Sequence, residues 1–169
     1  MLEITRIPYE EKTILSSLIQ LYRYDSSEFD GHSLNPHGVY LYKYFDHQWT
    51  ESHRYPYLLK VDGEIAGFVL VMKGVPREFV KVSQAEETNV ISEFFVMRKF
   101  RGKGYGKQAA HTIFRTHPGA WEVRQTKGNQ PANRFWNRVI GDITGGAYTE
   151  VRLDNESWRG PIQVFEVKE

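Results

Sequence analysis

The sequence predicts an α+β fold, in which a mixed central sheet of about seven strands is flanked by three to four helices. Three observations lead to this prediction. The chain has 169 residues, which suits one domain with a buried core. Segments with strand-like alternation occur on both sides of segments with helical spacing. No internal repeat or flexible linker divides the chain, so we expect a single domain over residues 1–169.

The first third of the chain predicts one strand, one clear helix and an irregular aromatic segment. LEITRI at 2–7 alternates between apolar and polar residues, as a strand does. Residues 25–56 are less regular, and VYLYKYFDHQW within them predicts a short helix with Tyr40 and Tyr44 on one face. Between these segments, apolar residues recur at the spacing of one helical face: Ile14, Leu15, Leu18, Ile19 and Tyr22.

The middle of the chain predicts three strands. YPYLLKV and IAGFVLVM flank the dipeptide Asp62-Gly63, a turn that suits a hairpin. Residues 74–88 are polar and are expected to form a loop. NVISEFFVM follows at 89–97 and is rich in β-branched and aromatic residues, which predicts a further strand.

The last third predicts two helices and three strands. A helix starts after Gly104 and stops at the HPG of 117–119, and AWEVRQ follows as a strand. NQPANRFWNRVIG is typical of a second helix, with Asn129 as its N-cap, Pro131 in its first turn and Gly141 just past its end. AYTEVRL and PIQVFEV close the chain as two strands.

Composition excludes several classes of function. The formal net charge is +1, so no overall field favours binding to nucleic acid or to a membrane. The absence of cysteine excludes disulfides, thiolate nucleophiles and cysteine–zinc sites. The six histidines lack the i, i+4 spacing of a helical metal pair, so no metal site is expected. The N-terminus lacks a signal-peptide core and no apolar run approaches the ~20 residues of a membrane span, which predicts a soluble, cytoplasmic protein.

RKFRGKGYGKQAA, at residues 98–110, predicts an anion site. A strand-like segment runs into a glycine-rich turn, and the turn opens a helix whose first N–H groups have no intrahelical partner. The peptide dipoles add partial positive charge at that end. Gly102, Gly104 and Gly106 lack a Cβ, so a ligand can approach the backbone closely. Together with the surrounding cations, these features predict a site for phosphate or pyrophosphate.

Two common phosphate-binding motifs fit this loop poorly. A P-loop requires Ser or Thr after Gly-Lys, whereas Gln108 follows Lys107 here. The dinucleotide-binding fingerprint is loosely satisfied by Gly104-x-Gly106-x-x-Ala109. However, MRKFR intervenes between the strand and the glycines, at a place where the dinucleotide-binding strand enters its turn directly.

The loop and the second helix together resemble a known family. VMRKFRGKGYGKQ resembles the pyrophosphate loop of the GNAT superfamily of acyl-CoA-dependent N-acyltransferases, and NQPANRFWNRVIG resembles that family's Asn-x-x-Ala-x-x-Phe-Tyr helix. The resemblance covers roughly residues 58–167 and implies a single GNAT-like domain, in which residues 8–56 are the variable acceptor-side helices. The matching positions are Arg101, Gly104 and Gly106 in the loop, and Asn129, Ala132 and Phe135 in the helix.

The resemblance implies an N-acetyltransferase that moves an acetyl group from acetyl-CoA to a primary amine, with a small molecule as the expected acceptor. Acetyl-CoA is then the cosubstrate, and no metal is required. The pantetheine arm is expected to pair with the strand before the loop, like an added strand. For Asn129, a purely capping role is the alternative to cofactor binding. The residues implied in cofactor binding are Phe94, Phe95, Val96, Arg101, Gly102, Lys103, Gly104, Tyr105, Gly106, Lys107, Asn129 and Phe135.

Acetyl transfer to an amine needs a base, because an alkylammonium has a pKa near ~10.4 and must lose a proton before it attacks. By the family resemblance, Glu93 on the strand before the loop is the first candidate, and Glu122 on the neighbouring strand is the second. An ordinary structural carboxylate is the alternative for each. Trp136 stands where the family's helix often has a Tyr that protonates the leaving thiolate, and an indole N–H cannot do this. No acid is therefore assigned, and Tyr105 and Tyr148 are the available phenols.

The acceptor site is expected to come from the N-terminal helices, where aromatic and acidic residues together suit a cationic amine. Core packing is the alternative for most of these aromatics. Two other functions stay open: a non-catalytic acyl-CoA sensor, which the missing Tyr favours, and an acetyltransferase that acts on protein or peptide amines. A homodimer is also left open. The candidate acceptor residues are Tyr22, Tyr24, Asp25, Glu28, Phe29, Asp30, Tyr40, Tyr44 and Trp49.

Overall fold

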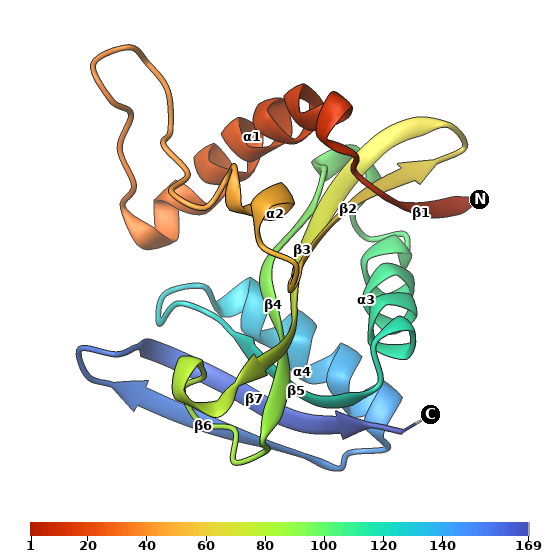
Figure 1. Cartoon of the computed structure of the whole chain (residues 1–169), viewed down its shortest axis with the longest axis vertical. Coiled ribbons are helices and arrows are strands. Elements are labelled where there is room, and N and C mark those ends of the chain that lie inside the picture. The colour runs from red at the N-terminus through yellow and green to blue at the C-terminus, as the bar shows by residue number, and fades with distance from the viewer. Residues whose placement is uncertain (169) are drawn as a thin grey trace.

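A computed structural model describes residues 1–168 and shows a seven-stranded sheet with helices on both faces (Figure 1). This architecture confirms the predicted α+β class with a mixed sheet. The strands are β1 (Leu2–Arg6), β2 (Arg54–Val61), β3 (Glu64–Pro76), β4 (Glu87–Val96), β5 (Gly119–Arg124), β6 (Tyr148–Asp154) and β7 (Arg159–Val167). The α-helices are α1 (Lys12–Asp30), α2 (His47–Thr50), α3 (Tyr105–Thr116) and α4 (Gln130–Thr144).

The sheet opens at its centre. Its strands follow the order β1-β2-β3-β4-β5-β7-β6, and β4 with β5 is the only parallel pair among the described strands. These two strands pair at three positions, from Asn89 opposite Trp121 to Ile91 opposite Val123. Beyond Ile91 they separate, and β4 runs on to Val96 with no strand partner on that side within residues 1–168.

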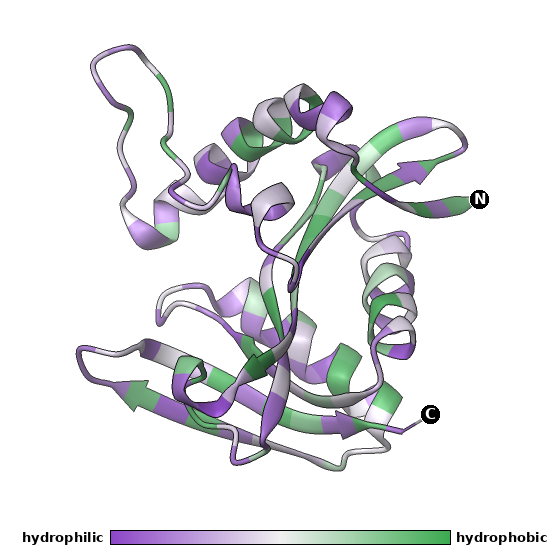
Figure 2. Cartoon of the chain, in the orientation of Figure 1, coloured by the Kyte–Doolittle hydropathy of each residue, from purple (hydrophilic) through white to green (hydrophobic). Residues whose placement is uncertain are grey.

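Each face of the sheet carries its own core, and apolar residues are concentrated along the central strands (Figure 2). α3 and α4 cover one face, where Phe114 packs edge-to-face on Trp121 with ring centroids 4.8 Å apart. α1 covers the other face, where Leu15 and Ile19 share a buried cluster with Phe68. Within residues 1–168, no helix combines the length and apolar character that a bilayer span requires.

The prediction of a short helix in VYLYKYFDHQW is wrong for most of that segment. α2 begins only at His47, and Tyr40 lies in a loop. The side-chain amide of Gln20 on α1 bonds both the N–H and the C=O of Tyr40, at 2.8 Å each. Because these two bonds tie the backbone of Tyr40 to α1, they replace the helical bonds that the spacing predicts. Tyr40 and Tyr44 therefore do not share a helical face.

α4 runs past its expected stop at Gly141 and ends at Thr144. Gly141 lies inside the helix, at a position where a Cβ would meet only the ring of Tyr148, at 3.7 Å. The helix ends at Gly145, whose φ of 62° is the left-handed conformation that closes many helices. The stop signal is thus a glycine, as expected, but at a later position.

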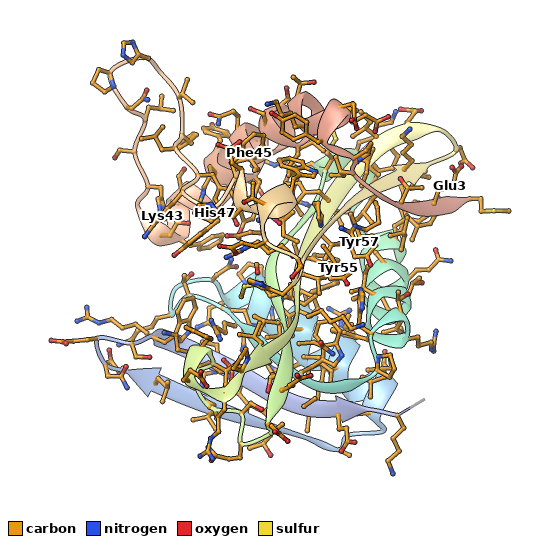
Figure 3. All side chains as sticks on the ribbon, viewed as in Figure 1. Glu3, Lys43, Phe45, His47, Tyr55 and Tyr57 are labelled. Atoms are coloured by element: carbon orange, nitrogen blue, oxygen red, sulfur yellow. The ribbon has the colours of Figure 1, made fainter. Side chains whose placement is uncertain are left out.

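The segment between α1 and α2 projects from the body of the protein (Figure 1). Its returning end is anchored beside α2, near Lys43, Phe45 and His47 (Figure 3). Phe45 packs edge-to-face on Trp49 with ring centroids 5.2 Å apart. Trp49 donates its indole N–H to the Ile7 carbonyl at 2.9 Å, so the base of the projection is tied to the chain that follows β1.

We expect Gly67→Ala to destabilise the protein by about 3 kcal/mol or more. Gly67 lies on β3 opposite Val96, and a Cβ at this position would overlap the carbonyl oxygen of Phe95. The strand pair would have to separate there, next to the part of β4 that borders the opening. Urea and thermal denaturation measure the loss.

Gly141→Ala is the matched control for this substitution. Its Cβ has ordinary contact distances, and alanine favours the helix, so this variant should gain about 0.5–1 kcal/mol. If Gly67→Ala were as stable as the wild type, the close approach of β3 to β4 at Phe95 would be disproved.

Candidate active site

A bulge in β4 determines the direction in which the side chain of Glu93, the first candidate base, points. Glu93 pairs with Leu70 and Ile91 pairs with Val71, so Ser92 is an extra residue on β4. Past the bulge, the side chain of Glu93 contacts α1, whereas Phe94 packs against α4. The bulge thus sits where β4 leaves β5, and it presents Glu93 on the α1 face.

The backbone of β4 beyond the bulge faces the opening at every second residue. The N–H of Met97 donates to the Ala66 carbonyl at 2.8 Å, toward β3. Because hydrogen-bonding direction alternates along a strand, Phe95 also faces β3, while Phe94 and Val96 face the opening. Phe95 has its side chain buried in the α1-side core. Of the three predicted strand residues, Phe94 therefore presents a free N–H and C=O to a ligand and Val96 presents a free N–H, whereas the Val96 carbonyl accepts from Arg101.

The glycine loop presents a run of unpaired backbone donors. Within residues 1–168, the N–H groups from Gly102 to Lys107 donate to no protein acceptor. Gly102 and Gly104 have φ angles of 72° and 85°, and a Cβ at either position would meet open space. Left-handed glycines turn the chain so that α3 begins with its N–H groups exposed. This arrangement fits a diphosphate.

Gly106 allows α3 to pack closely against α4. A Cβ at this position would lie 3.2 Å from the ring of Phe135 on α4, closer than side chains normally approach. The missing side chain lets the first turn of α3 rest against Phe135, whose ring also packs on Phe94 with centroids 5.6 Å apart. Phe135 thus connects the loop, α4 and β4.

Most cations of the loop have protein partners. Asp25 on α1 accepts from both Arg98 and Arg101, at 2.9 and 2.6 Å, and Arg101 also donates to the Val96 carbonyl at 2.7 Å. Lys107 pairs with Asp142 on α4 at 2.5 Å. Lys103 is left without an ion-pair partner among the described residues. The guanidinium of Arg101 thus holds the loop in place against β4 and α1.

Asn129 caps α4 and faces a cavity. Its Oδ1 accepts the Ala132 N–H at 3.1 Å, which leaves the side-chain NH₂ group for a ligand. The cavity has a volume of about 1060 Å³ and begins where β4 and β5 separate. Its wall combines α1, residues 42–54, the central strands, the start of α4 and the β6–β7 turn. The predicted site residues on this wall are Glu93, Phe94 and Asn129.

Glu93 is a half-buried carboxylate on the cavity wall. Burial raises the pKa of Glu93 above its ordinary value of 4.5, although a hydrogen bond from the Tyr22 hydroxyl and the charge of Arg23 act in the opposite direction. Burial and the nearby Glu93 charge in turn raise the pKa values of Tyr22 and Tyr42, so both phenols stay protonated. The cavity therefore holds a carboxyl group whose pKa is raised by burial.

Glu122 occupies a different environment. It is fully buried, and its oxygens accept the backbone N–H groups of Lys81, Val82 and Ser83 at 3.0–3.1 Å. Arg124 donates to the same carboxylate at 2.7 Å. Burial alone would raise the pKa of Glu122, but these donors and the Arg124 charge outweigh it and lower the pKa. The contacts describe an anchor for the loop between β3 and β4.

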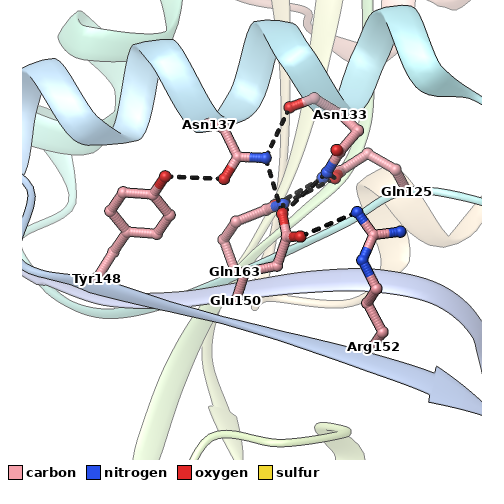
Figure 4. Close-up of polar contacts among 7 residues, drawn as sticks. All are labelled: Gln125, Asn133, Asn137, Tyr148, Glu150, Arg152 and Gln163. Atoms are coloured by element: carbon pink, nitrogen blue, oxygen red, sulfur yellow. Dashed lines mark hydrogen bonds and ion pairs between the residues drawn. The ribbon is translucent and has the colours of Figure 1, made fainter.

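A buried amide cluster holds the start of α4 on the sheet, and no sequence pattern pointed to it (Figure 4). Glu150 on β6 accepts from Asn133 and Asn137 of α4, at 2.9 and 2.7 Å, and from Gln163 of β7 at 2.8 Å. Gln125, which follows β5, exchanges two bonds with Gln163. Such a network fixes the position of α4, and with it Asn129.

Only part of the expected acceptor set reaches the cavity. Tyr22, Asp30 and Tyr44 line it. Asp25 is bound to the loop arginines, and Trp49 packs on Phe45. The sequence analysis missed several basic side chains on the same wall: Arg23, Arg54, Lys81 and Arg124.

Comparison with known proteins identifies the family. The sequence model of the Acetyltransferase (GNAT) family matches residues 18–141, most of the chain. The chain belongs to the GNAT acetyltransferase family. It is an acetyl-CoA-dependent N-acetyltransferase, with acetyl-CoA as its acetyl donor. No protein with a curated description matches the sequence significantly.

Solved structures share the fold of this acetyltransferase at low sequence identity. An acetyltransferase from Thermus thermophilus superposes with a TM-score of 0.72 at 15% identity, over 99% of this chain and 97% of that one. The aminoglycoside acetyltransferase AAC(6')-Ib in complex with coenzyme A gives 0.67 at 11% identity, over 98% and 95%. Arabidopsis thaliana NAA60 in complex with a bisubstrate analogue gives 0.62 at 13% identity, over 98% of each chain.

The acetyltransferase has Trp136 on the cavity wall, packed edge-to-face on Phe94 with ring centroids 4.9 Å apart. The two phenols available from the sequence lie elsewhere. Tyr148 donates to Asn137 at 2.8 Å, in the amide cluster, and Tyr105 packs on Phe100. In the described part of the chain, no three His, Asp or Glu side chains are placed together to hold a metal.

We expect Glu122→Gln to lower the free energy of unfolding at neutral pH by about 3 kcal/mol, because it removes the charge that pairs with Arg124 in a buried site. The wild-type pKa of Glu122 is lowered by folding, so its contribution is present above the ordinary pKa of 4.5 and is lost as pH falls through the folded value. The difference between the two proteins should therefore shrink on acidification, which urea unfolding across a pH series measures.

Glu166→Gln is the control for this prediction. Glu166 is an exposed carboxylate on β7, opposite Ala120 of the strand that carries Glu122. This change should leave stability within about 0.5 kcal/mol of the wild type. Equal stability of Glu122→Gln and Glu166→Gln would show that the buried carboxylate does not anchor the loop.

Proposed function

We propose that this acetyltransferase moves the acetyl group to the primary amine of a small molecule, with Glu93 as the general base. One observation carries the proposal: a bulge directs a carboxylate of raised pKa into the cavity at the point where β4 leaves β5. No other element of the described sheet combines free backbone donors with a half-buried carboxyl group on the cavity wall.

The chain's own groups fit acetyl-CoA, which supplies the activated thioester when bound. The N–H groups of Gly102–Lys107 would hold the diphosphate, as the start of a helix does. The C=O of Phe94 and the N–H of Val96 would bond the amides of the pantetheine arm, in the manner of an added strand. The free side-chain NH₂ of Asn129, across the opening, would bind the same arm while its Oδ1 caps α4.

Glu93 would accept the proton of the amine. An alkylammonium gives up its proton at a pKa of about 10.4, so a base of ordinary carboxylate strength is poorly matched to it. Burial strengthens Glu93 as a base, and the Tyr22 hydroxyl fixes the orientation of its carboxylate. Tyr22 thus acts as a positioning residue.

The N–H of Phe94 would stabilise the charge that develops on the thioester oxygen. It faces the opening one residue after Glu93, so base and donor lie on adjacent residues of β4. A preorganised donor of this kind typically lowers the barrier by about 2.7–4 kcal/mol. We assign no general acid, because a thiol of pKa about 8.5 leaves readily as a thiolate near neutral pH.

The side chains around Glu93 form a concave wall that suits a small acceptor. Tyr22 and Asp30 of α1, Tyr42 before α2 and Trp158 in the β6–β7 turn all contribute to this wall. A small amine needs only such a pocket beside Glu93 to reach the base. A peptide acetylation screen with no modified sequence, alongside turnover of small amines, would agree with this proposal.

We expect Glu93→Gln to lower kcat by about 10²- to 10⁴-fold, since general-base catalysis contributes that much. The wild-type rate should fall as pH drops through the raised pKa of Glu93, because only the carboxylate accepts a proton. The variant should lose this limb of the profile. Free-thiol release from acetyl-CoA measures both effects.

Two controls accompany this experiment. Coenzyme A should bind the Glu93→Gln variant as tightly as the wild type in titration calorimetry. Glu87→Gln changes an exposed carboxylate at the start of the same strand and should leave the rate unaltered. An unchanged pH profile in Glu93→Gln would remove Glu93 from the reaction.

We expect Gly104→Ala to weaken coenzyme A binding by about 10-fold or more, because a left-handed conformation disfavours alanine and the N–H groups would be redirected. Gly146→Ala is a matched control. Gly146 follows α4, has the same φ of 85° and also faces open space. Calorimetry should show the loss of affinity in Gly104→Ala alone, although both variants lose stability. Similar affinities in both variants would contradict diphosphate binding at Gly104.

A further inference from the structure

Three residues of the cavity wall each carry one buried polar atom without a partner. Within residues 1–168, six buried side-chain nitrogen or oxygen atoms lack a hydrogen-bond partner, and three of them belong to cavity-lining residues. They are Nε of Arg23, Oγ of Ser92 and Nη2 of Arg124. Buried polar atoms are almost always satisfied in folded proteins, so three such atoms on residues of one wall distinguish this wall from the rest of the core.

The acidic groups of the wall are already engaged. Glu51 pairs with Arg54 at 2.5 Å. Asp30 accepts from the ring and the backbone N–H of His32, at 2.8 and 3.0 Å. Glu93 accepts the Tyr22 hydroxyl. None of these carboxylates pairs with Arg23 or Arg124 among the described residues.

The basic groups of the wall are in excess. Arg23 stacks near the Tyr42 ring, 5.3 Å from its centroid, and has no carboxylate within ion-pair distance in the described chain. Lys81 also lacks an ion-pair partner there. Arg124 bonds Glu122 through Nε only, and its side chain is 15% exposed. A guanidinium cannot lose its proton to relieve this imbalance, so an anion that binds here would be paired with a permanent charge.

These groups lie on both sides of the proposed base. Arg124 follows Val123, whose partner on β4 is Ile91, and Ser92 and Glu93 come next on β4. Arg23 follows Tyr22, which bonds Glu93, and the charge of Arg23 acts on Glu93 directly. Both guanidinium groups and Glu93 therefore belong to the wall of one cavity.

We propose that the acceptor carries a carboxylate or phosphate a few bonds from its amine, and that Arg23, Ser92 and Arg124 bind this anion. This inference rests on the proposed function, because it concerns the substrate of the same site. An acceptor with several positive charges would be repelled.

Matched pairs of amines test the proposal. 4-Aminobutyrate is compared with butylamine, and phosphoethanolamine with ethanolamine, each with acetyl-CoA. The anionic member of at least one pair should have a kcat/KM higher by about 10- to 100-fold, as expected for one charge-assisted hydrogen bond. The pair that shows the larger ratio distinguishes a carboxylate from a phosphate. Spermidine should be a poor acceptor.

Substitutions of the two arginines test whether these side chains cause the preference for anionic amines. Arg23→Gln and Arg124→Gln should each reduce the preference for the anionic amine by about 10-fold or more and leave coenzyme A affinity unchanged. Arg124 also bonds Glu122, so Arg124→Gln is accompanied by Arg124→Lys, which should restore part of the preference. Arg23 has no such structural partner, and its variant remains informative if Arg124→Gln folds poorly.

Equilibrium binding separates this inference from the proposed function. Calorimetry on the enzyme with coenzyme A should detect 4-aminobutyrate or phosphoethanolamine, but not the uncharged partner compound, and Arg23→Gln should abolish this binding. The same result without turnover of any amine would support the anion site and overturn the proposed catalysis. Turnover of neutral amines or spermidine as efficient as that of the anionic amines would overturn the anion site and leave catalysis intact.

Discussion

The site depends on one constraint: β4 and β5 pair at three positions and then separate. In a continuous sheet the N–H and C=O groups of Phe94 and the N–H of Val96 would be bonded to a neighbouring strand, because buried backbone groups are rarely left unpaired. The separation leaves these three groups without a strand partner, while the Val96 carbonyl accepts from Arg101. Every proposed role in acetyl transfer is defined relative to this opening.

Different interactions hold the two sides of the opening apart. On the α4 side, Phe135 and Trp136 pack on Phe94, and the amide cluster around Glu150 fixes the helix to β6 and β7. On the α1 side, the bulge at Ser92 turns Glu93 toward Tyr22. Packing and hydrogen bonds thus fix the position of the walls, and the unpaired charges of Arg23 and Lys81 lie on these walls.

The sequence predicted what local patterns encode. The seven strands, the cap at Asn129 and the glycine loop all depend on residues close together in the chain. Predictions were wrong or incomplete where a residue far away in the sequence determines the local structure or the surroundings of a side chain. The bond from Gln20 to Tyr40 removes a helix, and the three backbone N–H groups that hold Glu122 come from residues about forty positions earlier. No sequence motif marks Arg23 or Arg124 as a site residue, because the residues next to them in the chain do not show that they share a cavity with Glu93.

The ion pairs of the glycine loop have a kinetic consequence. Arg98 and Arg101 share Asp25, Lys99 pairs with Glu64, and Lys107 pairs with Asp142, so three carboxylates offset only part of the charge of these cations. Two arginines share one carboxylate, and Lys103 has no ion-pair partner among the described residues, so the loop keeps a net positive charge in addition to the field of its exposed N–H groups. The loop therefore attracts a polyphosphate before contact, and this association is faster at low ionic strength.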